Sequence, residues 1–396
     1  MRIDFGKDID RTQSGSIKWD FTERFLTPAQ AAANPLPLWI ADTEFPPPPC
    51  VTSALKSAIE TGVLGYSAAT NSYLSSVKSW QKTHFDWDTQ SEWILQTPGV
   101  VTALNIAIQA FTQPGDSVLI QPPVYSHFRE DVLLNEREVV SAPLRLNADG
   151  TYRFDRASFE AAIRHDTKLF ILCNPHNPTG NVWSEEDLRA MGDICLKHRI
   201  LVISDEIHQD LIFNPKQKHI PFVKLGSAFA NNSIVCTAPS KTFNLAGLQV
   251  SNLFIPNEEV RATFSRQMTK NGIHLVNQLG LIACEAAYRD GAEWLEEFLK
   301  HIKANHEYLS NELQKHLPQL KVTPTDSLYL AWVDFRALSL STDALMDFLT
   351  IKAKVWFDNG VKFSQEGHGF MRVNVGCSRA TLAEAIERLK HAVNAI

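Results

Sequence analysis

The chain has 396 residues, of which 44% are hydrophobic, so it can bury a large core and favours a division into two domains. The formal net charge is -6 and no long basic run occurs, so no nucleic-acid partner is expected. Charged residues interrupt residues 1–8, where a signal peptide would be apolar, and no stretch approaches the roughly 18 consecutive apolar residues of a membrane span. We expect a cytoplasmic protein with no membrane partner.

The cysteines and histidines show no metal-binding pattern. The six cysteines include no CxxC pair, and several lie in apolar runs, so we expect them to be reduced and structural. The thirteen histidines include no HxxxH or HExxH spacing, so no metal site is expected.

An extended arm is predicted near the N-terminus. Residues 39–45 (Trp-Ile-Ala-Asp-Thr-Glu-Phe) precede four prolines at 46–49, which lack the backbone donors that a helix needs. Such an arm is either a surface linker or one wall of a cleft between domains. Helical spacing follows over residues 51–60, and glycines at 62 and 65 mark a turn before Tyr66.

A possible anion site follows the short strand predicted at residues 92–96. The next helix opens with Thr-Pro-Gly-Val-Val-Thr at residues 97–102 and runs to Phe111. A glycine at a helix start lets an anion reach free backbone amides, where the helix dipole also favours negative charge. A phosphate could bind at residues 99–102, but many helices begin with proline and glycine for structural reasons alone.

Short apolar runs alternate with helical segments from residue 114 onward, as in a buried parallel sheet. The runs cover residues 118–120, 169–173, 201–204, 234–237 and 250–255. Ser184 and Asp187 predict a capping box at the start of one intervening helix. The fold class is therefore α/β, in which ligands bind beyond the carboxyl ends of the strands. The polar residues that follow such strands are Tyr125, Asn177, Asp205, His208 and Lys241.

The pattern changes near residue 285 to long amphipathic segments and then to strand-like pieces around residues 329–334 and 370–375. Alternation with apolar neighbours places Arg372 on one face of the last piece. We expect an N-terminal arm at residues 1–50, a large domain at 51–285 and a smaller C-terminal domain at 286–396.

Lys241 is the candidate reactive residue. It lies just past the apolar run at residues 234–237, in Ala-Pro-Ser-Lys-Thr-Phe-Asn-Leu-Ala-Gly (238–247). Burial or neighbouring positive charge makes a lysine amine a nucleophile toward aldehydes. On this local pattern alone, a solvated surface lysine is an equally good reading.

Three motifs together carry a family resemblance. They are Asn-Pro-His-Asn-Pro-Thr-Gly at residues 174–180, Ser-Asp-Glu-Ile-His-Gln-Asp at 204–210, and Ser240 with Lys241. Their order and separations resemble those of the fold type I enzymes that use pyridoxal 5'-phosphate (PLP), and the likeness covers nearly the whole chain. The resemblance implies a large domain with a mostly parallel central sheet and a smaller α+β domain formed by both chain ends.

The resemblance also implies roles around the cofactor. Lys241 is expected to bind PLP covalently, and Asp205 matches the carboxylate that faces the ring nitrogen. Asn177 and His208 match positions that contact the phenolate oxygen of the ring, and Tyr125 matches the aromatic residue that stacks on it.

Substrate binding is expected to involve Arg372, Asn177 and Tyr66. Arg372 matches the bidentate clamp for the α-carboxylate of the substrate. Residues 39–45, 65–67, 98–101, 205–208 and 239–247 resemble the cystathionine β-lyase branch, carbon–sulfur β-lyases that include maltose-regulon modulators of transcription. In that branch a tyrosine matching Tyr66 is contributed by the neighbouring subunit and reaches the cofactor phosphate. The likeness therefore implies a homodimer with a shared active site, in which Tyr66 is also catalytic.

The chain departs at four positions from the pattern of ordinary aminotransferases or of this branch. His208 stands where ordinary aminotransferases usually carry tyrosine. Gln249 stands where many aminotransferases have a phosphate-binding arginine, so the phosphate is expected to rely on Ser240, Tyr66 and the amides of Val100 and Val101. The branch usually shows Ala-Asp-Met-Asp-Phe, whereas residues 41–45 have threonine and glutamate at positions 43 and 44.

Three functions remain open. The leading one is a lyase that cleaves L-cystathionine or a related cysteine S-conjugate to a thiol, pyruvate and ammonia. The second is an aminotransferase on the same fold. The third is a regulatory protein that keeps the cofactor but acts by binding a transcription factor.

Overall fold

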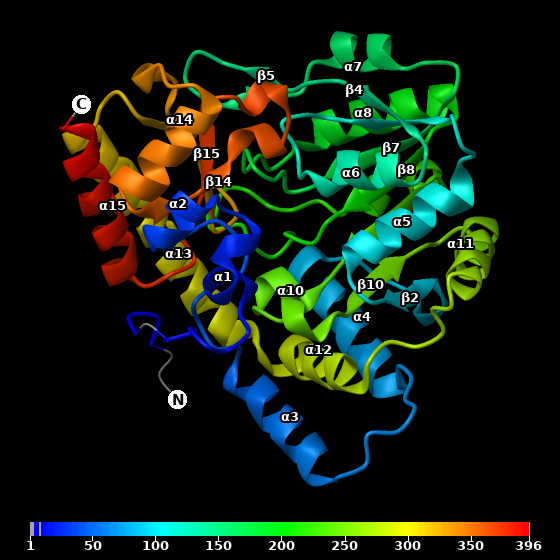
Figure 1. Cartoon of the computed structure of the whole chain (residues 1–396). Helices are drawn as coiled ribbons and strands as arrows, with labels where there is room; N and C mark the ends of the chain where they lie inside the picture. The colour runs from blue at the N-terminus through cyan, green and yellow to red at the C-terminus, as the bar shows by residue number, and fades with distance from the viewer. Residues whose placement is uncertain (1–3, 8, 396) are drawn as a thin grey trace.

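The computed structural model describes residues 4–7 and 9–395, which are organised around a seven-stranded sheet (Figure 1). The strand order is β2-β10-β9-β8-β7-β3-β4, and the five strands from β9 to β4 run parallel. This mostly parallel sheet confirms the predicted α/β class. The strands are β2 (Ile94–Thr97), β10 (Ser251–Phe254), β9 (Ser233–Thr237), β8 (Leu201–Asp205), β7 (Thr167–Cys173), β3 (Ser117–Ile120) and β4 (Glu138–Ser141).

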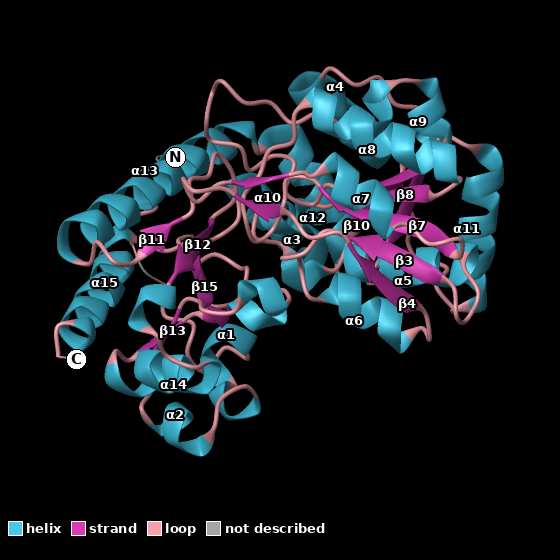
Figure 2. Cartoon of the chain, turned by 90° about the horizontal axis from the view of Figure 1, so that it is seen from above, coloured by secondary structure: helices cyan, strands magenta, loops and turns pink. Residues whose placement is uncertain are grey.

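Helices cover both faces of this sheet, and Figure 2 shows them above and below the strands. The two faces carry separate apolar cores, because successive side chains of a strand point in opposite directions. One face is covered by α5 (Val100–Phe111), α6 (His127–Leu134) and α11 (Glu258–Lys270). The other is covered mainly by α4 (Asn71–Phe85), α7 (Arg156–Ala162), α8 (Glu185–His198), α9 (Ser227–Asn231) and α12 (Gln278–Asp290).

A second, antiparallel sheet has the order β11-β12-β15-β14. Its strands are β11 (Lys321–Val322), β12 (Leu330–Asp334), β15 (Phe370–Asn374) and β14 (Asp358–Asn359). The helices of this region are α13 (Ala292–His316), α14 (Thr342–Asp347) and α15 (Arg379–Val393). Strand β1 (Leu36–Pro37) pairs with β13 (Val355–Trp356), so the segment before the prolines lies beside the C-terminal part of the chain.

Four further α-helices and a hairpin remain. The helices are α1 (Ile17–Asp20), α2 (Pro28–Ala32), α3 (Pro49–Glu60) and α10 (Pro239–Thr242), and the hairpin is β5 (Arg145–Leu146) with β6 (Tyr152–Arg153). Within residues 4–7 and 9–395, no helix combines the length and apolar character needed to cross a membrane, and no cluster of histidine, cysteine or acidic side chains could hold a metal ion.

The structure differs from the sequence expectations in three local features. The run at residues 250–255 forms β10, which is antiparallel to both neighbours, because a short apolar run carries no information on strand direction. Residues Ser91–Trp93 form a 3-10 turn before β2. Ser184 caps α8 by accepting from the Asp187 amide, but the Asp187 carboxylate accepts from the Ser184 hydroxyl, so the reciprocal half of the predicted capping box is missing.

Candidate active site

A cavity of about 390 Å³ lies beyond the carboxyl ends of the parallel strands. Except for Tyr66, it is lined by every residue that the sequence predicts for the site. These are Val100, Val101, Tyr125, Asn177, Asp205, His208, Ser240, Lys241 and Arg372. Residues 39–41 also line it, so the predicted arm forms one wall of the cleft and is not merely a surface linker.

Lys241 follows β9 in the single turn of α10, and its amine points into this cavity. Its Nζ donates to the carbonyl oxygen of Ala41 at 2.7 Å. Burial lowers the pKa of Lys241 to about 8; the positive charge of Arg372 adds to this effect, while Asp42 and Asp205 oppose it. The neutral, nucleophilic amine is therefore available at mildly alkaline pH.

Asp205 ends β8 and is buried beneath the cavity. Burial raises the pKa of its carboxyl group to about 7, whereas the hydrogen bond from the Ile207 amide and the charge of Lys241 hold it down. A carboxylate in this position gains from a cationic hydrogen-bond donor in the cavity. The protonated ring nitrogen of PLP is a donor of that kind.

His208 and Arg372 line the cavity, and each has a buried nitrogen without a hydrogen-bond partner among the described residues. His208 is 3% exposed, and burial lowers its pKa well below the ordinary value, so the imidazole is neutral. The two nitrogens are Nδ1 of His208 and Nε of Arg372. Because unpaired buried polar atoms are costly, both nitrogens favour a polar ligand. Together with Asp205 they fit the cofactor that the resemblance implies.

Asn177 and Tyr125 come from loops that lie against each other, since the Tyr125 amide donates to the carbonyl oxygen of Asn177 at 3.1 Å. The Asn177 side chain accepts from Nη1 of Arg372 at 3.2 Å through Oδ1, which leaves its amide nitrogen for a ligand. The Tyr125 ring is half-buried on the cavity wall, and burial raises the pKa of its hydroxyl. A planar ring in the cavity would therefore meet an aromatic face.

Arg372 on β15 is held by groups that the sequence reading missed. Its Nη2 donates to Oδ2 of Asp358 at 2.8 Å and to the carbonyl oxygen of Trp39 at 3.0 Å. Asp358 in turn accepts from Lys362 at 2.9 Å. Asp358 and Arg372 are paired across β14 and β15, and only knowledge of that strand register could have identified the contact.

The start of α5 lies at the cavity, where the sequence predicts an anion site. Gly99 has φ 91°, a conformation that favours glycine, and the helix begins at Val100. The first amides of a helix have no partner within it, so those at Val100 and Val101 can bind an anion. Ser240 and Gln249 also line the cavity.

Tyr66 lies away from this cavity. Its relative exposure is 101%, and it belongs to residues 62–70, which form no helix or strand. Within one chain, the structure therefore does not bring Tyr66 to the other candidate residues.

Comparisons with known proteins agree on the family. The family described as "Aminotransferase class I and II" matches residues 38–389. Cystathionine beta-lyase PatB of Bacillus subtilis is 42% identical over 393 residues, which cover 99% of this chain and all of PatB. A PLP-bound putative aminotransferase from Clostridium difficile 630 is 39% identical with a TM-score of 0.96, over 99% of this chain and all of that one. Cystalysin from Treponema denticola is 35% identical with a TM-score of 0.94, over the full length of both. The chain therefore belongs to the family of class I and II aminotransferases.

Proposed function

We propose that the protein is a PLP-dependent carbon–sulfur β-lyase that cleaves L-cystathionine or related cysteine S-conjugates to a thiol, pyruvate and ammonia. The observation that carries this proposal is the full-length similarity to a cystathionine β-lyase. The cavity supports it, because a reactive amine, a buried carboxylate and an arginine line one space.

Each of these groups has a task that its surroundings favour. Arg372 binds the substrate α-carboxylate through charge-assisted hydrogen bonds. Lys241, with its lowered pKa, removes the α-proton as a neutral amine. Asp205 holds a proton on the ring nitrogen of the cofactor. PLP, when bound, supplies an electron sink for the charge that develops at the α-carbon.

The rival function is transamination, which shares these residues up to the removal of the α-proton. One of the similar structures is described as a putative aminotransferase, and this similarity supports transamination as a second candidate function. In elimination, the carbon–sulfur bond breaks and the thiolate leaves with the bonding electrons. In transamination, that bond stays intact and a keto acid must accept the amino group. His208 and Gln249, which replace a usual tyrosine and arginine, are the cues within the cavity for the lyase.

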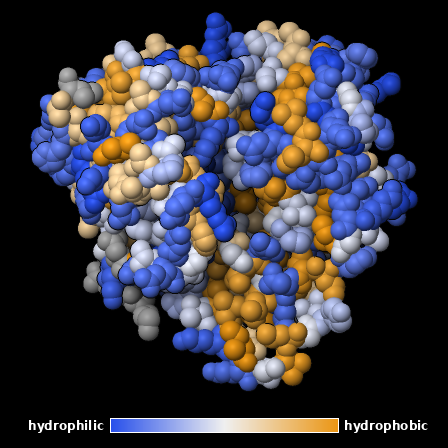
Figure 3. Space-filling model, in the orientation of Figure 1, coloured by the Kyte–Doolittle hydropathy of each residue, from blue (hydrophilic) through white to orange (hydrophobic). Residues whose placement is uncertain are grey.

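We further propose a homodimer in which Tyr66 reaches the cofactor phosphate of the partner subunit. In Figure 1, α3 and the segment after it project from the lower edge of the molecule, and Figure 3 shows apolar side chains gathered there. The large exposed apolar residues of this region are Ile59, Val63 and Leu64, with exposures of 57%, 72% and 62%. Such a patch is typical of a protein–protein interface. We also propose, as a separate point, that residues 51–285 form the large domain, while residues 1–50 form the N-terminal arm and residues 286–396 form the small domain.

The test is incubation of the PLP-loaded protein with L-cystathionine, with and without a keto acid. Thiol and pyruvate without any keto acid support the lyase. A new amino acid that forms only when a keto acid is present supports the aminotransferase. Absence of both products from folded, PLP-loaded protein contradicts both catalytic proposals.

A further inference from the structure

Residues 39–45, here called the strap, connect two groups of the candidate site through their backbone. The carbonyl oxygen of Trp39 accepts from Arg372 at 3.0 Å. The carbonyl oxygen of Ala41 accepts from Lys241 at 2.7 Å and from the Tyr329 hydroxyl at 3.0 Å. The position of the strap therefore determines where an acceptor lies for the Lys241 amine.

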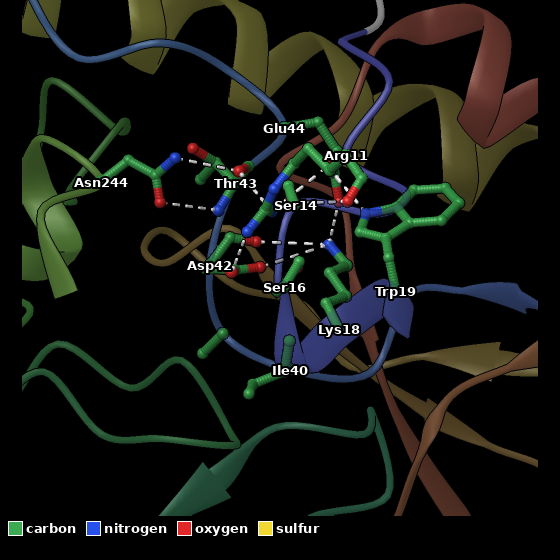
Figure 4. A network of polar contacts seen from close by, with 12 residues as sticks. Arg11, Ser14, Ser16, Lys18, Trp19, Ile40, Asp42, Thr43, Glu44 and Asn244 are labelled. Atoms are coloured by element: carbon green, nitrogen blue, oxygen red, sulfur yellow. Dashed lines mark hydrogen bonds and ion pairs between the residues drawn. The ribbon is translucent and has the colours of Figure 1, made fainter. Parts of the chain in front are cut away.

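Asn244, three residues after Lys241, holds the strap on one side (Figure 4). Its Oδ1 accepts from the Thr43 amide at 3.1 Å, and its Nδ2 donates to the carbonyl oxygens of Thr43 and Phe45 at 2.9 Å. Asn374 binds the carbonyl oxygens of Ile40 and Asp42 at 2.7 and 2.6 Å. Uncharged side chains thus fix the backbone of the strap.

The charged side chains of the strap are held by the N-terminal segment (Figure 4). Lys18 Nζ lies 2.5 Å from Oε1 of Glu44 and 3.7 Å from Oδ1 of Asp42. Arg11 lies 2.8 Å from Asp42 through Nη2 and 3.3 Å from Glu44 through Nη1. We call these four residues the charge cluster. It contains two cations and two anions, so its formal charge is zero.

The zero formal charge of the charge cluster matters because two of its members, Lys18 and Glu44, are buried. The side chain of Lys18 is 0% exposed, and that of Glu44 is 4% exposed. A buried ion that loses its partner is strongly disfavoured, whereas an exposed ion is screened by water. Loss of the Lys18 charge would leave the cluster with a net negative charge beside the strap. Water would screen the buried Glu44 carboxylate only weakly, and the Asp42 carboxylate, which is 21% exposed, more strongly.

We propose that Lys18, assisted by Arg11, is a positioning residue for the reaction: it neutralises Asp42 and Glu44 and thereby fixes the strap and the electrostatic environment of Lys241. The inference rests on the proposed function only in taking Lys241 as the residue that binds the cofactor.

The charges that face Lys241 determine the direction of the effect. Asp42 and Asp205 raise its pKa, and Arg372 lowers it. The neighbouring His208 is neutral, and burial raises the pKa of Tyr329, so its hydroxyl stays protonated. Removal of the Lys18 cation leaves Asp42 less compensated and so favours the protonated form of the Lys241 nitrogen. Removal of the Asp42 carboxylate acts in the opposite direction.

The experiment compares the PLP-loaded protein with the variants Lys18→Met, Asp42→Asn and Lys82→Met. Lys82 is the control, because it also contacts two carboxylates, those of Asp86 and Asp88, but is 50% exposed. In the PLP-loaded protein the Lys241 nitrogen is bonded to the cofactor, and its protonation changes the visible absorbance. An absorbance titration therefore measures the pKa of this bound nitrogen, which the same neighbouring charges shift in the same directions, without turnover. We expect Lys18→Met to raise this pKa by about 0.5 to 1 unit, Asp42→Asn to lower it by a similar amount, and Lys82→Met to leave it unchanged.

Opposite shifts separate an electrostatic and positioning role from a merely structural one. If Lys18→Met and Asp42→Asn shift the pKa in the same direction, or if neither shifts it in folded protein, the proposal is wrong. Should Lys18→Met not fold, Arg11→Gln takes its place, with an upward shift again expected. The titration requires no lyase activity, so a failed cystathionine assay and a failed titration are separate results.

Discussion

Arg372 and Asp358 face each other across strands β15 and β14, with Nη2 of the arginine 2.8 Å from Oδ2 of the aspartate. Both side chains are nearly buried, with exposures of 4% and 10%. An arginine held in this way keeps a fixed orientation, and its Nε and the second hydrogen of Nη1 are the donors that remain for a carboxylate.

Asp358→Ala removes the hydrogen bond that orients Arg372. We therefore expect KM for the amino-acid substrate to rise about tenfold, which corresponds to one charge-assisted hydrogen bond lost between Arg372 and the substrate carboxylate. Removal of the Asp358 carboxylate also removes a negative charge that repels the substrate carboxylate, which by itself would lower KM. We expect the loss of a fixed Arg372 orientation to have the larger effect on KM, because carboxylate binding by arginine depends on orientation. Steady-state kinetics provide the measurement. Asp334→Ala is the control, since Asp334 pairs with the exposed Arg336 at 2.7 Å. Equal KM values for Asp358→Ala and the parent protein would refute the anchoring role.

Lys241→Ala should reduce turnover at least about a thousandfold, because the variant lacks both the cofactor-binding amine and the base. Borohydride reduction of the PLP-loaded parent protein should attach the cofactor to the peptide that contains Lys241, as peptide mapping can show. The exposed Lys216→Ala variant should behave like the parent. Pyruvate release by Lys241→Ala at the parent rate is incompatible with the assignment.

Tyr66→Phe should weaken cofactor retention about tenfold, because it removes one hydrogen bond to a charged phosphate. Equilibrium dialysis measures the dissociation constant, and sedimentation gives the oligomeric state. Tyr308→Phe is a suitable control, since the Tyr308 ring packs 4.3 Å from Arg379, away from the cavity. A fully active monomer at nanomolar concentration would remove the basis for a role across the interface.

Acid should destabilise the fold through His306. Burial lowers the pKa of His306 to about 4, against about 6.5 for an unperturbed histidine. Between these values the unfolded chain binds the proton more readily, so the free energy of unfolding falls as pH drops, by up to about 3 kcal/mol for this residue.

Denaturant unfolding at pH 7 and pH 4.5 tests this prediction. His306→Gln should lose less stability than the parent over this interval, but part of the loss should remain because burial also lowers the pKa of His176 to about 4. The exposed His391→Gln is the control. An equal loss in His306→Gln and the parent would contradict the assignment.

Much of the fold and site could be predicted because parallel strands bring their carboxyl ends to one edge. Residues at or just after the ends of β7, β8 and β9, such as Asn177, Asp205 and Lys241, therefore meet around one cavity. Asp358 and Lys18 could not be found in this way. The contact of Asp358 with Arg372 depends on the register of β14 and β15, and the contact of Lys18 with Glu44 depends on the path of the N-terminal segment. Neither feature produces a recognisable local sequence pattern.

Product stoichiometry with L-cystathionine as the only substrate tests the central claim most directly. The PLP-loaded protein should release thiol, pyruvate and ammonia in equal amounts, with no added keto acid and no new amino acid from transamination. Turnover that requires a keto acid and releases no thiol would contradict the lyase and establish an aminotransferase.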